Sequence, residues 1–311
     1  MSKNFWSDKR VLVTGGTGFL GRHLVKKLQA KNPKKITLTD SKKDNLRIIA
    51  NCSRVVKNQD IVIHLAAIVG GIGFNRENPA TMFYDNAVMG IHLMEEARKA
   101  KIGKFVNLMT VCSYPKFAPI PFREEDIWSG YPEETNAPYG LAKKMLLVQG
   151  QAYRQQYGFN SIHLVPVNLY GPGDKFDPKK SHVIPALIRK VLEAKKNNQN
   201  QILVWGTSKA SREFLYVEDA VDGILQAAEI YNKPEPVNLG SAQEISIKDL
   251  AKLICKLAGF SGKIIFDKTK PDGQPRRKLN VSRARKEFKF TATTTLEKGL
   301  KKTINWYQKY F

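Results

Sequence analysis

The chain has 311 residues, three cysteines and a formal net charge of +23 at pH 7. This length suffices for one large α/β unit or two interleaved domains without disulfide bonds. The cysteines, at positions 52, 112 and 255, are too widely spaced for a disulfide framework or a zinc site, so we expect no metal and a reducing, cytoplasmic environment. No segment reaches the roughly 20 apolar residues of a membrane span. The lysines are scattered and form no nucleic-acid-binding motif, so we expect no nucleic-acid partner, although a basic diphosphate pocket fits the same composition.

Short apolar, β-branched runs alternate with amphipathic stretches in the first half of the chain, a pattern typical of βαβ units and a parallel sheet. The sequence predicts strands at residues 10–15, 35–39, 61–67, 104–110 and 161–170, and helices at 20–30, 47–57, 79–100 and 138–157. Residues 1–171 are therefore expected to form a Rossmann-like, doubly wound dinucleotide-binding domain of the α/β class.

Beyond residue 171 the alternation loosens. The sequence predicts helices at 181–196, 217–231 and 246–259 and strands at 201–206 and 236–241. Ser246 is the expected N-cap of the last helix and Gly259 its end. We expect residues 172–311 to form mainly a smaller, C-terminal substrate-binding lobe over the carboxyl ends of the strands, with residues 212–241 or so returning to the first sheet.

The stretch "VLVTGGTGFLGRHLVKKL" places three glycines, Gly15, Gly18 and Gly21, between a predicted strand and a predicted helix. Glycines at this place allow a tight turn and let the backbone approach a pyrophosphate at the helix N-terminus. An ordinary strand–helix turn is the alternative interpretation. The order of strand, glycines and helix favours a dinucleotide, and the spacing resembles the extended branch of the short-chain dehydrogenase/reductase superfamily.

The end of the second predicted strand carries conflicting signals for the choice of cofactor. Asp40 can accept hydrogen bonds from a ribose 2′-hydroxyl and would repel a 2′-phosphate, whereas Ser41, Lys42 and Lys43 could bind that phosphate. A solvated polar turn is the third interpretation.

The stretch "APYGLAKK" places Tyr139 and Lys143 on one helical face. A lysine ammonium near a phenol favours the phenolate and makes tyrosine a usable proton donor or acceptor. An exposed amphipathic helix is the alternative. Because the pair follows a sheet with a glycine turn, it resembles the Tyr/Lys pair of the short-chain reductases. In those enzymes the lysine also holds the nicotinamide ribose. Thr110 matches the Ser or Thr that these enzymes carry on the preceding strand.

Cys112 stands two residues after Thr110, so both side chains are expected to point the same way at the strand end. A buried structural thiol is the alternative interpretation. The segments "HLAAIVGGIGFNRENPATMFYDN", "CSYPK", "PVNLYGPGDKFDP", "SHVIPALIRK", "VWGTSKASREFLYVEDA" and "KPDGQPRRKL" together resemble the GDP-L-fucose synthase family over nearly the whole chain. That family belongs to the NAD-dependent epimerases/dehydratases and carries out 3,5-epimerisation and 4-reduction of GDP-4-keto-6-deoxy-D-mannose.

The resemblance implies the residues of the site. Cys112 and His182 would exchange the C3 and C5 protons, and Tyr139 with Thr110 would act at the C4 oxygen. His182 could instead cap or pack against its helix. The resemblance implies cofactor contacts from Gly15, Gly18, Phe19, Leu20, Gly21, Asp40, Ser41, Ala66, Ala67, Asn86, Lys143, Pro166, Asn168, Leu169 and His182, and substrate contacts from Lys190, Trp205, Arg212 and Asp272. It also implies NADPH as cofactor, with NADH as the alternative, a GDP-sugar substrate, and a homodimer formed through helices 79–100 and 138–157.

Two departures from the family pattern concern the same sites. Members that use NADPH commonly carry arginines where this chain has Thr17 and the Asp40–Ser41 pair, and many relatives have serine where Val111 stands.

A 4,6-dehydratase would show glutamate in place of Cys112, and a GDP-mannose 3,5-epimerase would pair the cysteine with lysine. A reductase of a GDP-4-keto-heptose would keep every named residue. A non-catalytic dinucleotide-sensing or nucleic-acid-binding regulator would have lost the catalytic set, which is present.

Overall fold

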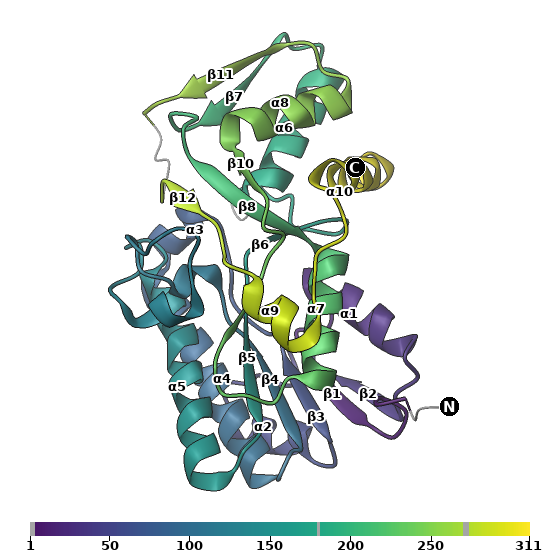
Figure 1. Cartoon of the computed structure of the whole chain (residues 1–311). Helices are drawn as coiled ribbons and strands as arrows, with labels where there is room; N and C mark the ends of the chain where they lie inside the picture. Colours follow the sequence, from purple (N-terminus) through teal and green to yellow (C-terminus); the bar gives the residue numbers. More distant parts are fainter. Residues whose placement is uncertain (1–3, 179–180, 270–273) are drawn as a thin grey trace.

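The computed structural model describes residues 4–178, 181–269 and 274–311 (Figure 1). A parallel sheet of six strands, in the order β2-β1-β3-β4-β5-β9, forms the larger part of the molecule. Its strands are β1 (Arg10–Thr14), β2 (Lys35–Leu38), β3 (Ile61–His64), β4 (Lys104–Leu108), β5 (Ser161–Pro166) and β9 (Val237–Leu239). Because β2 and β3 lie on opposite sides of β1, the sheet is doubly wound, as predicted.

Helices cover both faces of this sheet, which explains the continuous apolar runs of its strands. On β1, Leu12 faces a core with α2 (Ile49–Val56), α4 (Pro79–Lys99) and α5 (Ala137–Tyr157). Val11 and Val13 face the opposite core, which includes side chains of α1 (Phe19–Gln29), α7 (Val217–Ile230) and α9 (Ser282–Phe288). A short helix, α3 (Ile72–Glu77), precedes α4. No helix of the described residues is both long and apolar enough to cross a bilayer.

A smaller lobe lies at one end of the six-stranded sheet (Figure 1). At its centre β8 pairs with the parallel strands β6 and β12 and with antiparallel β10, while β7 and β11 form a separate parallel pair. A second core joins these strands to three helices. The elements are β6 (Asn168–Tyr170), α6 (Val183–Lys196), β7 (Gln201–Trp205), β8 (Ser211–Tyr216), β10 (Glu244–Ser246), α8 (Ile247–Ala258), β11 (Lys263–Asp267), β12 (Arg276–Arg277) and α10 (Leu296–Tyr310).

The ends of α8 confirm the capping prediction. The Ser246 hydroxyl accepts a hydrogen bond from the backbone N–H of Asp249, and Gly259 ends the helix with a φ of 65°. The single strand predicted for residues 161–170 is wrong. The N–H of Val167 still bonds Leu239 in the large sheet, but from Asn168 onward the chain pairs with β8 in the lobe. A mainly apolar run carries no signal for such a change of partner, since it can pair equally well with a strand of the large sheet or with a strand of the lobe.

Candidate active site

The glycine turn follows β1, where β1 and β3 lie side by side. Gly15 has a φ of +68°, and a Cβ atom there would come within 2.8 Å of the Ala66 backbone nitrogen. That nitrogen donates to the Thr14 hydroxyl oxygen over 3.2 Å, which fixes the segment after β3 against the turn. A Cβ on Gly21 would overlap the carbonyl oxygen of Gly15. The absence of side chains at these two positions leaves a backbone cradle that fits a pyrophosphate at the start of α1.

The other predicted cofactor residues occupy neighbouring positions at the same edge of the sheet. Asn86, on α4, is buried and bonds the backbone of Ile68 through both amide atoms (2.9 and 3.1 Å), so it fixes the loop after β3. Apart from Lys143 and His182, the remaining ones lie at the start of α1, just after β2 and β3, at the end of β5 and in β6, namely Gly18, Phe19, Leu20, Asp40, Ser41, Ala66, Ala67, Pro166, Asn168 and Leu169. The carboxyl ends of these strands therefore bring the predicted dinucleotide contacts to one edge.

Thr110 and Cys112 are joined by a local turn. Strand β4 ends at Leu108, and the Thr110 hydroxyl oxygen accepts a hydrogen bond from the Cys112 N–H (3.2 Å) as N-cap of the 3₁₀ helix η1 (Val111–Ser113). The expectation that strand alternation aligns the two side chains is therefore wrong. The N-cap bond closes a helical turn in place of a further strand residue.

The start of α5 packs directly on this turn. A Cβ on Gly140 would overlap the carbonyl oxygen of Cys112, and the Ser113 hydroxyl donates to the Gly140 carbonyl over 3.1 Å. This close approach is what puts Tyr139 beside the thiol. The burial of its phenol, together with the charge of a Cys112 thiolate, raises the pKa of Tyr139. The phenol is consequently protonated near neutral pH, which suits a proton donor better than the phenolate that the sequence suggested.

Lys143 lies one turn further along α5 with 1% of its surface exposed. Burial lowers the pKa of its ammonium group to about 8. The buried His64 at the end of β3 is close enough for the lysine charge, after burial itself, to lower the histidine pKa. His64 therefore stays neutral while its Nδ1 atom bonds the Thr14 hydroxyl over 2.8 Å. This arrangement places the charge of Lys143 near the carboxyl end of β3.

His182 occupies the N-cap position of α6, but its side chain makes no capping bond. The structural role that the sequence left open, a side-chain helix cap, is therefore not found. The side chain keeps an exposed surface, but the protein atoms around the ring partly desolvate it, and this desolvation lowers the imidazole pKa. The charges of Lys175 and Arg277 lower the pKa further. A neutral imidazole can accept a proton from carbon and return it.

Arg277 is a residue of the site that sequence reasoning missed. Its Nη1 atom donates to the Cys112 sulfur over 3.6 Å, and its Nε atom donates to the Gln274 side chain over 2.8 Å. Only 8% of its surface is exposed. The sequence offers Arg276 and Arg277 as equals, but Arg276 points to Glu244 at the surface. Only the pairing of β12 with β8 turns the second arginine inward.

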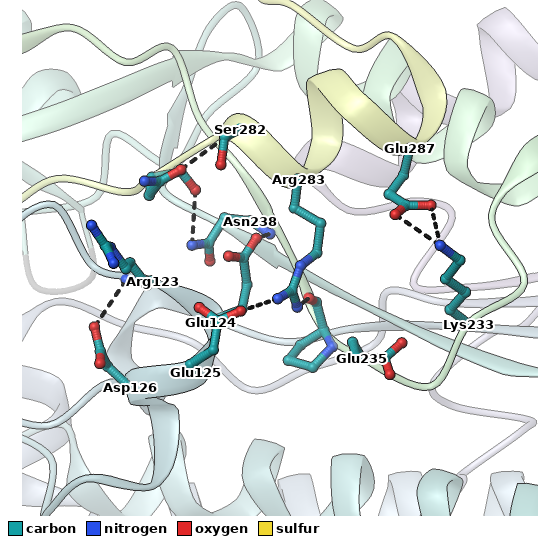
Figure 2. Close-up of polar contacts among 12 residues, drawn as sticks. Arg123, Glu124, Glu125, Asp126, Lys233, Glu235, Asn238, Ser282, Arg283 and Glu287 are labelled. Atoms are coloured by element: carbon teal, nitrogen blue, oxygen red, sulfur yellow. Dashed lines mark hydrogen bonds and ion pairs between the residues drawn. The ribbon is translucent and has the colours of Figure 1, made fainter.

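A buried network centred on Asn238 supports the segments that carry Cys112 and Arg277. Figure 2 shows Asn238 beside Glu124. The Tyr114 hydroxyl donates to the Asn238 side chain on β9 over 2.7 Å, and the Asn238 amide donates to the Asn280 carbonyl over 3.1 Å. Tyr114 follows Cys112 by two residues and Asn280 follows Arg277 by three. The Asn238 backbone N–H donates to Glu124 in the 3₁₀ helix η2 (Glu124–Trp128), and burial raises the pKa of that carboxyl. One asparagine thus ties both segments to the sheet.

The predicted substrate residues lie in the lobe. The Lys190 ammonium on α6 donates to the Leu203 carbonyl over 2.8 Å and lies 5.7 Å from the centre of the Trp205 ring. Arg212 on β8 is the register partner of Arg277, so two arginines occupy neighbouring backbone positions at the lobe side of the site. Such a pair favours an anionic ligand. Asp272 lies outside the described residues.

Comparison with known proteins agrees with this arrangement. Residues 11–240 match the model of the NAD dependent epimerase/dehydratase family. A GDP-L-fucose synthase of Sinorhizobium fredii is 40% identical over 296 residues, 95% of this chain and 94% of that protein. The structure of a GDP-L-fucose synthetase of Naegleria fowleri bound to NADP is 28% identical in sequence and gives a TM-score of 0.88. The match covers 97% of this chain and 95% of the Naegleria chain.

A GDP-6-OMe-4-keto-L-xylo-heptose reductase of C. jejuni gives a TM-score of 0.91 over 98% of this chain and 99% of that one. At 23% identity it shows the shared fold alone. The family match and the full-length relatives confirm the family suggested by the sequence motifs. The chain therefore belongs to the NAD-dependent epimerase/dehydratase family, with GDP-L-fucose synthases among its relatives.

Proposed function

We propose that this protein epimerises C3 and C5 of GDP-4-keto-6-deoxy-D-mannose and reduces C4 with NADPH to give GDP-L-fucose. The observation that carries the proposal is the packing of the Cys112 turn on the start of α5, which makes a thiol and a protonated phenol neighbours. The likeness to GDP-L-fucose synthases over nearly the whole chain supports this substrate. A GDP-4-keto-heptose is the alternative substrate, and a non-catalytic regulator is the alternative of another class.

Epimerisation needs one group on each face of the sugar ring. The protons on C3 and C5 are both α to the C4 carbonyl, so removal of either gives an enolate whose oxygen Tyr139 and Thr110 can stabilise. We assign proton removal and return to Cys112 and His182. The Arg277 guanidinium, bonded to the sulfur, stabilises the thiolate that removes a proton.

Reduction follows at the same carbonyl. NADPH, when bound, would supply the hydride to C4, and NADP in the Naegleria relative supports this cofactor, with NADH as the alternative. Tyr139, which is protonated near neutral pH, donates a proton to the C4 oxygen. Lys143 would hold the nicotinamide ribose, and the Arg212–Arg277 pair with Lys190 and Trp205 would bind the GDP moiety.

We further propose a division of labour within the chain, a homodimer and a location in the cytoplasm. Residues 1–171 together with α7, β9 and α9 would form the dinucleotide-binding domain, and most of residues 172–311 the substrate lobe. Exposed apolar side chains on α4 and α5, which pack side by side, support a helix-mediated dimer. They are Phe83, Tyr84, Met145 and Val148.

The test is turnover of GDP-4-keto-6-deoxymannose in deuterated water. We expect Cys112→Ser and His182→Asn to lower deuterium exchange at C3 and C5 by about a hundredfold, the usual contribution of a general acid or base. Tyr139→Phe should chiefly slow nicotinamide oxidation. Mass spectrometry follows the exchange and absorbance at the nicotinamide band follows the reduction.

Three results would contradict the proposal. Unchanged exchange in both the Cys112 and His182 variants would refute their assignment as the proton-transfer pair. Reduction without inversion in the wild-type protein would leave a plain ketoreductase, and absence of turnover with either cofactor would favour the heptose substrate or a regulator. Cys255→Ser, which changes a buried thiol of the lobe core, is the matched control and should leave both rates unchanged.

A further inference from the structure

The end of β2 lies directly beside the glycine turn. A Cβ atom on Gly16 would come within 2.7 Å of the Leu38 side chain, and the N–H of Thr39 bonds the Val13 carbonyl over 3.4 Å. Asp40 therefore emerges from the strand next to the cradle for the pyrophosphate. In a doubly wound sheet this is the place where the ribose of the adenosine half of a dinucleotide lies.

Local hydrogen bonds hold Asp40 in a compact turn. Its Oδ1 atom accepts from the Lys42 N–H over 2.8 Å, and its own N–H donates to the Asp44 carboxylate over 2.8 Å. Its carbonyl oxygen accepts from the Asp44 N–H over 2.6 Å. Two carboxylates are thus fixed within one short turn. A carboxylate has about four lone-pair sites, so Asp40 can accept further bonds from ribose hydroxyls while keeping its turn.

The arginines around this turn already have anionic or carbonyl partners. Arg47 bonds Asp85 over 3.1 Å, and Arg54 bonds Asp44 over 2.8 Å. Arg22, on α1, donates to the Gly173 carbonyl over 3.0 Å. A 2′-phosphate is normally bound by a guanidinium fork. Arg47 and Arg22 are engaged outside the turn, and Arg54 is engaged within it, by the Asp44 carboxylate and the Lys43 carbonyl. Apart from Arg54, which is paired with Asp44, the exposed lysines of the turn, Lys42 and Lys43, are the cations that could compensate for the Asp40 charge.

We infer that Asp40 is a specificity-determining residue, which makes this chain favour a dinucleotide whose adenosine ribose carries no 2′-phosphate, NAD(H), over NADP(H). The carboxylate gains hydrogen bonds from the free 2′- and 3′-hydroxyls, and it repels a phosphate that carries up to two negative charges. The inference rests on the proposed function, whose reduction step requires a nicotinamide dinucleotide, and it puts NADH, the alternative cofactor named there, in the place of NADPH. It sets the cofactor of this chain apart from that of the Naegleria relative bound to NADP.

Equilibrium binding without sugar substrate tests the inference. Titration calorimetry with NADH and with NADPH should give NADH at least about tenfold tighter binding, since one extra repulsion between unit charges at contact distance is worth roughly that factor. Asp40→Asn and Asp40→Ala should weaken NADH binding and strengthen NADPH binding, which inverts the ratio. Circular dichroism and melting temperature check that each variant is folded.

Asp222→Asn is the matched charge control. Its carboxylate pairs with Lys27 towards the end of α1, away from the glycine turn, and the substitution changes the net charge by the same amount. We expect it to leave the NADH/NADPH ratio unchanged. An equal shift of the ratio by the Asp40 and Asp222 variants would overturn the inference, because net charge alone would then explain it.

Other outcomes separate this inference from the proposed function. Tighter binding of NADPH than NADH by the wild-type protein, weakened by Lys42→Ala or Lys43→Ala, would overturn the role of Asp40 and leave the proposed reaction intact. Binding of neither dinucleotide would overturn the proposed function and the inference with it. Preference for NADH, together with an inverted ratio in both Asp40 variants, would establish it.

Discussion

At the scale of single residues, Arg277 gives the site a permanent positive charge next to the Cys112 sulfur. Replacing it by glutamine should lower deuterium exchange at C3 and C5 by about tenfold or more, since a hydrogen bond to a charged group contributes about 1.5–3 kcal/mol. Arg277→Lys keeps the charge and should recover much of the loss. The same two variants should differ in the rate at which iodoacetamide alkylates Cys112.

Arg276→Gln is the control for this prediction. Arg276 is adjacent in sequence, but its half-exposed side chain pairs with Glu244 and makes no bond to the Cys112 sulfur. It should leave exchange and alkylation unchanged. An equal loss of exchange in both glutamine variants would contradict a specific role for Arg277.

The residues of the site differ in how far their placement follows from sequence. The glycine turn was predictable because strand, glycines and helix must follow one another in that order, and Gly15 meets Ala66 as such a turn requires. Arg277 was not predictable, because its inward direction depends on a two-residue strand paired with β8. The Tyr139 pKa also could not be inferred, since helical spacing places Lys143 nearby but says nothing of burial.

At the scale of elements, the contact between η1 and α5 depends on the missing side chain of Gly140. In Gly140→Ala the added Cβ atom would overlap the Cys112 carbonyl, so the turn and the helix must separate. Because a misplacement of about 1 Å can cost about a hundredfold in rate, we expect both exchange and reduction to fall by that order. Steady-state kinetics and deuterium exchange measure the two steps separately.

Gly73→Ala is the matched control, since no atom lies within 4 Å of the Cβ it would add to α3. It should keep both rates and gain slightly in melting temperature, because alanine is the better helix former. If Gly140→Ala retained full activity, the close approach of η1 and α5 would not be needed for the chemistry.

The longer helices were largely predictable, because their apolar residues follow the helical period throughout. The helices α1, α4, α5 and α8 begin and end within one or two residues of the predicted bounds. The short strands of the lobe were missed, because β10 and β12 have only three and two residues and owe their conformation to pairing with β8. Helices α9 and α10 were missed as well.

At the scale of the whole molecule, the exposed apolar side chains of α4 and α5 predict the assembly. A double variant, Tyr84→Glu with Val148→Glu, should convert a dimer into a monomer, because burying two unpaired carboxylates in an interface is costly. Sedimentation velocity gives the mass of each form.

Ile230→Glu is the control, since this residue is similarly exposed at the end of α7. It should sediment as the wild-type protein does. A wild-type monomer at micromolar concentration, or a double variant that remains dimeric, would contradict an interface formed by these helices.

The order in which the chain supplies its parts affects how it can fold during synthesis. The sixth strand of the large sheet, β9, comes from residues 237–239, and α9, which packs on β9 and α7, comes from residues 282–288. Between β9 and α9 the chain runs through the lobe, where it forms β10, α8, β11 and β12. Neither part is complete while the other is still being translated. Unlike proteins whose domains finish one after another, this chain must leave the ribosome almost entirely before its thiol meets Arg277.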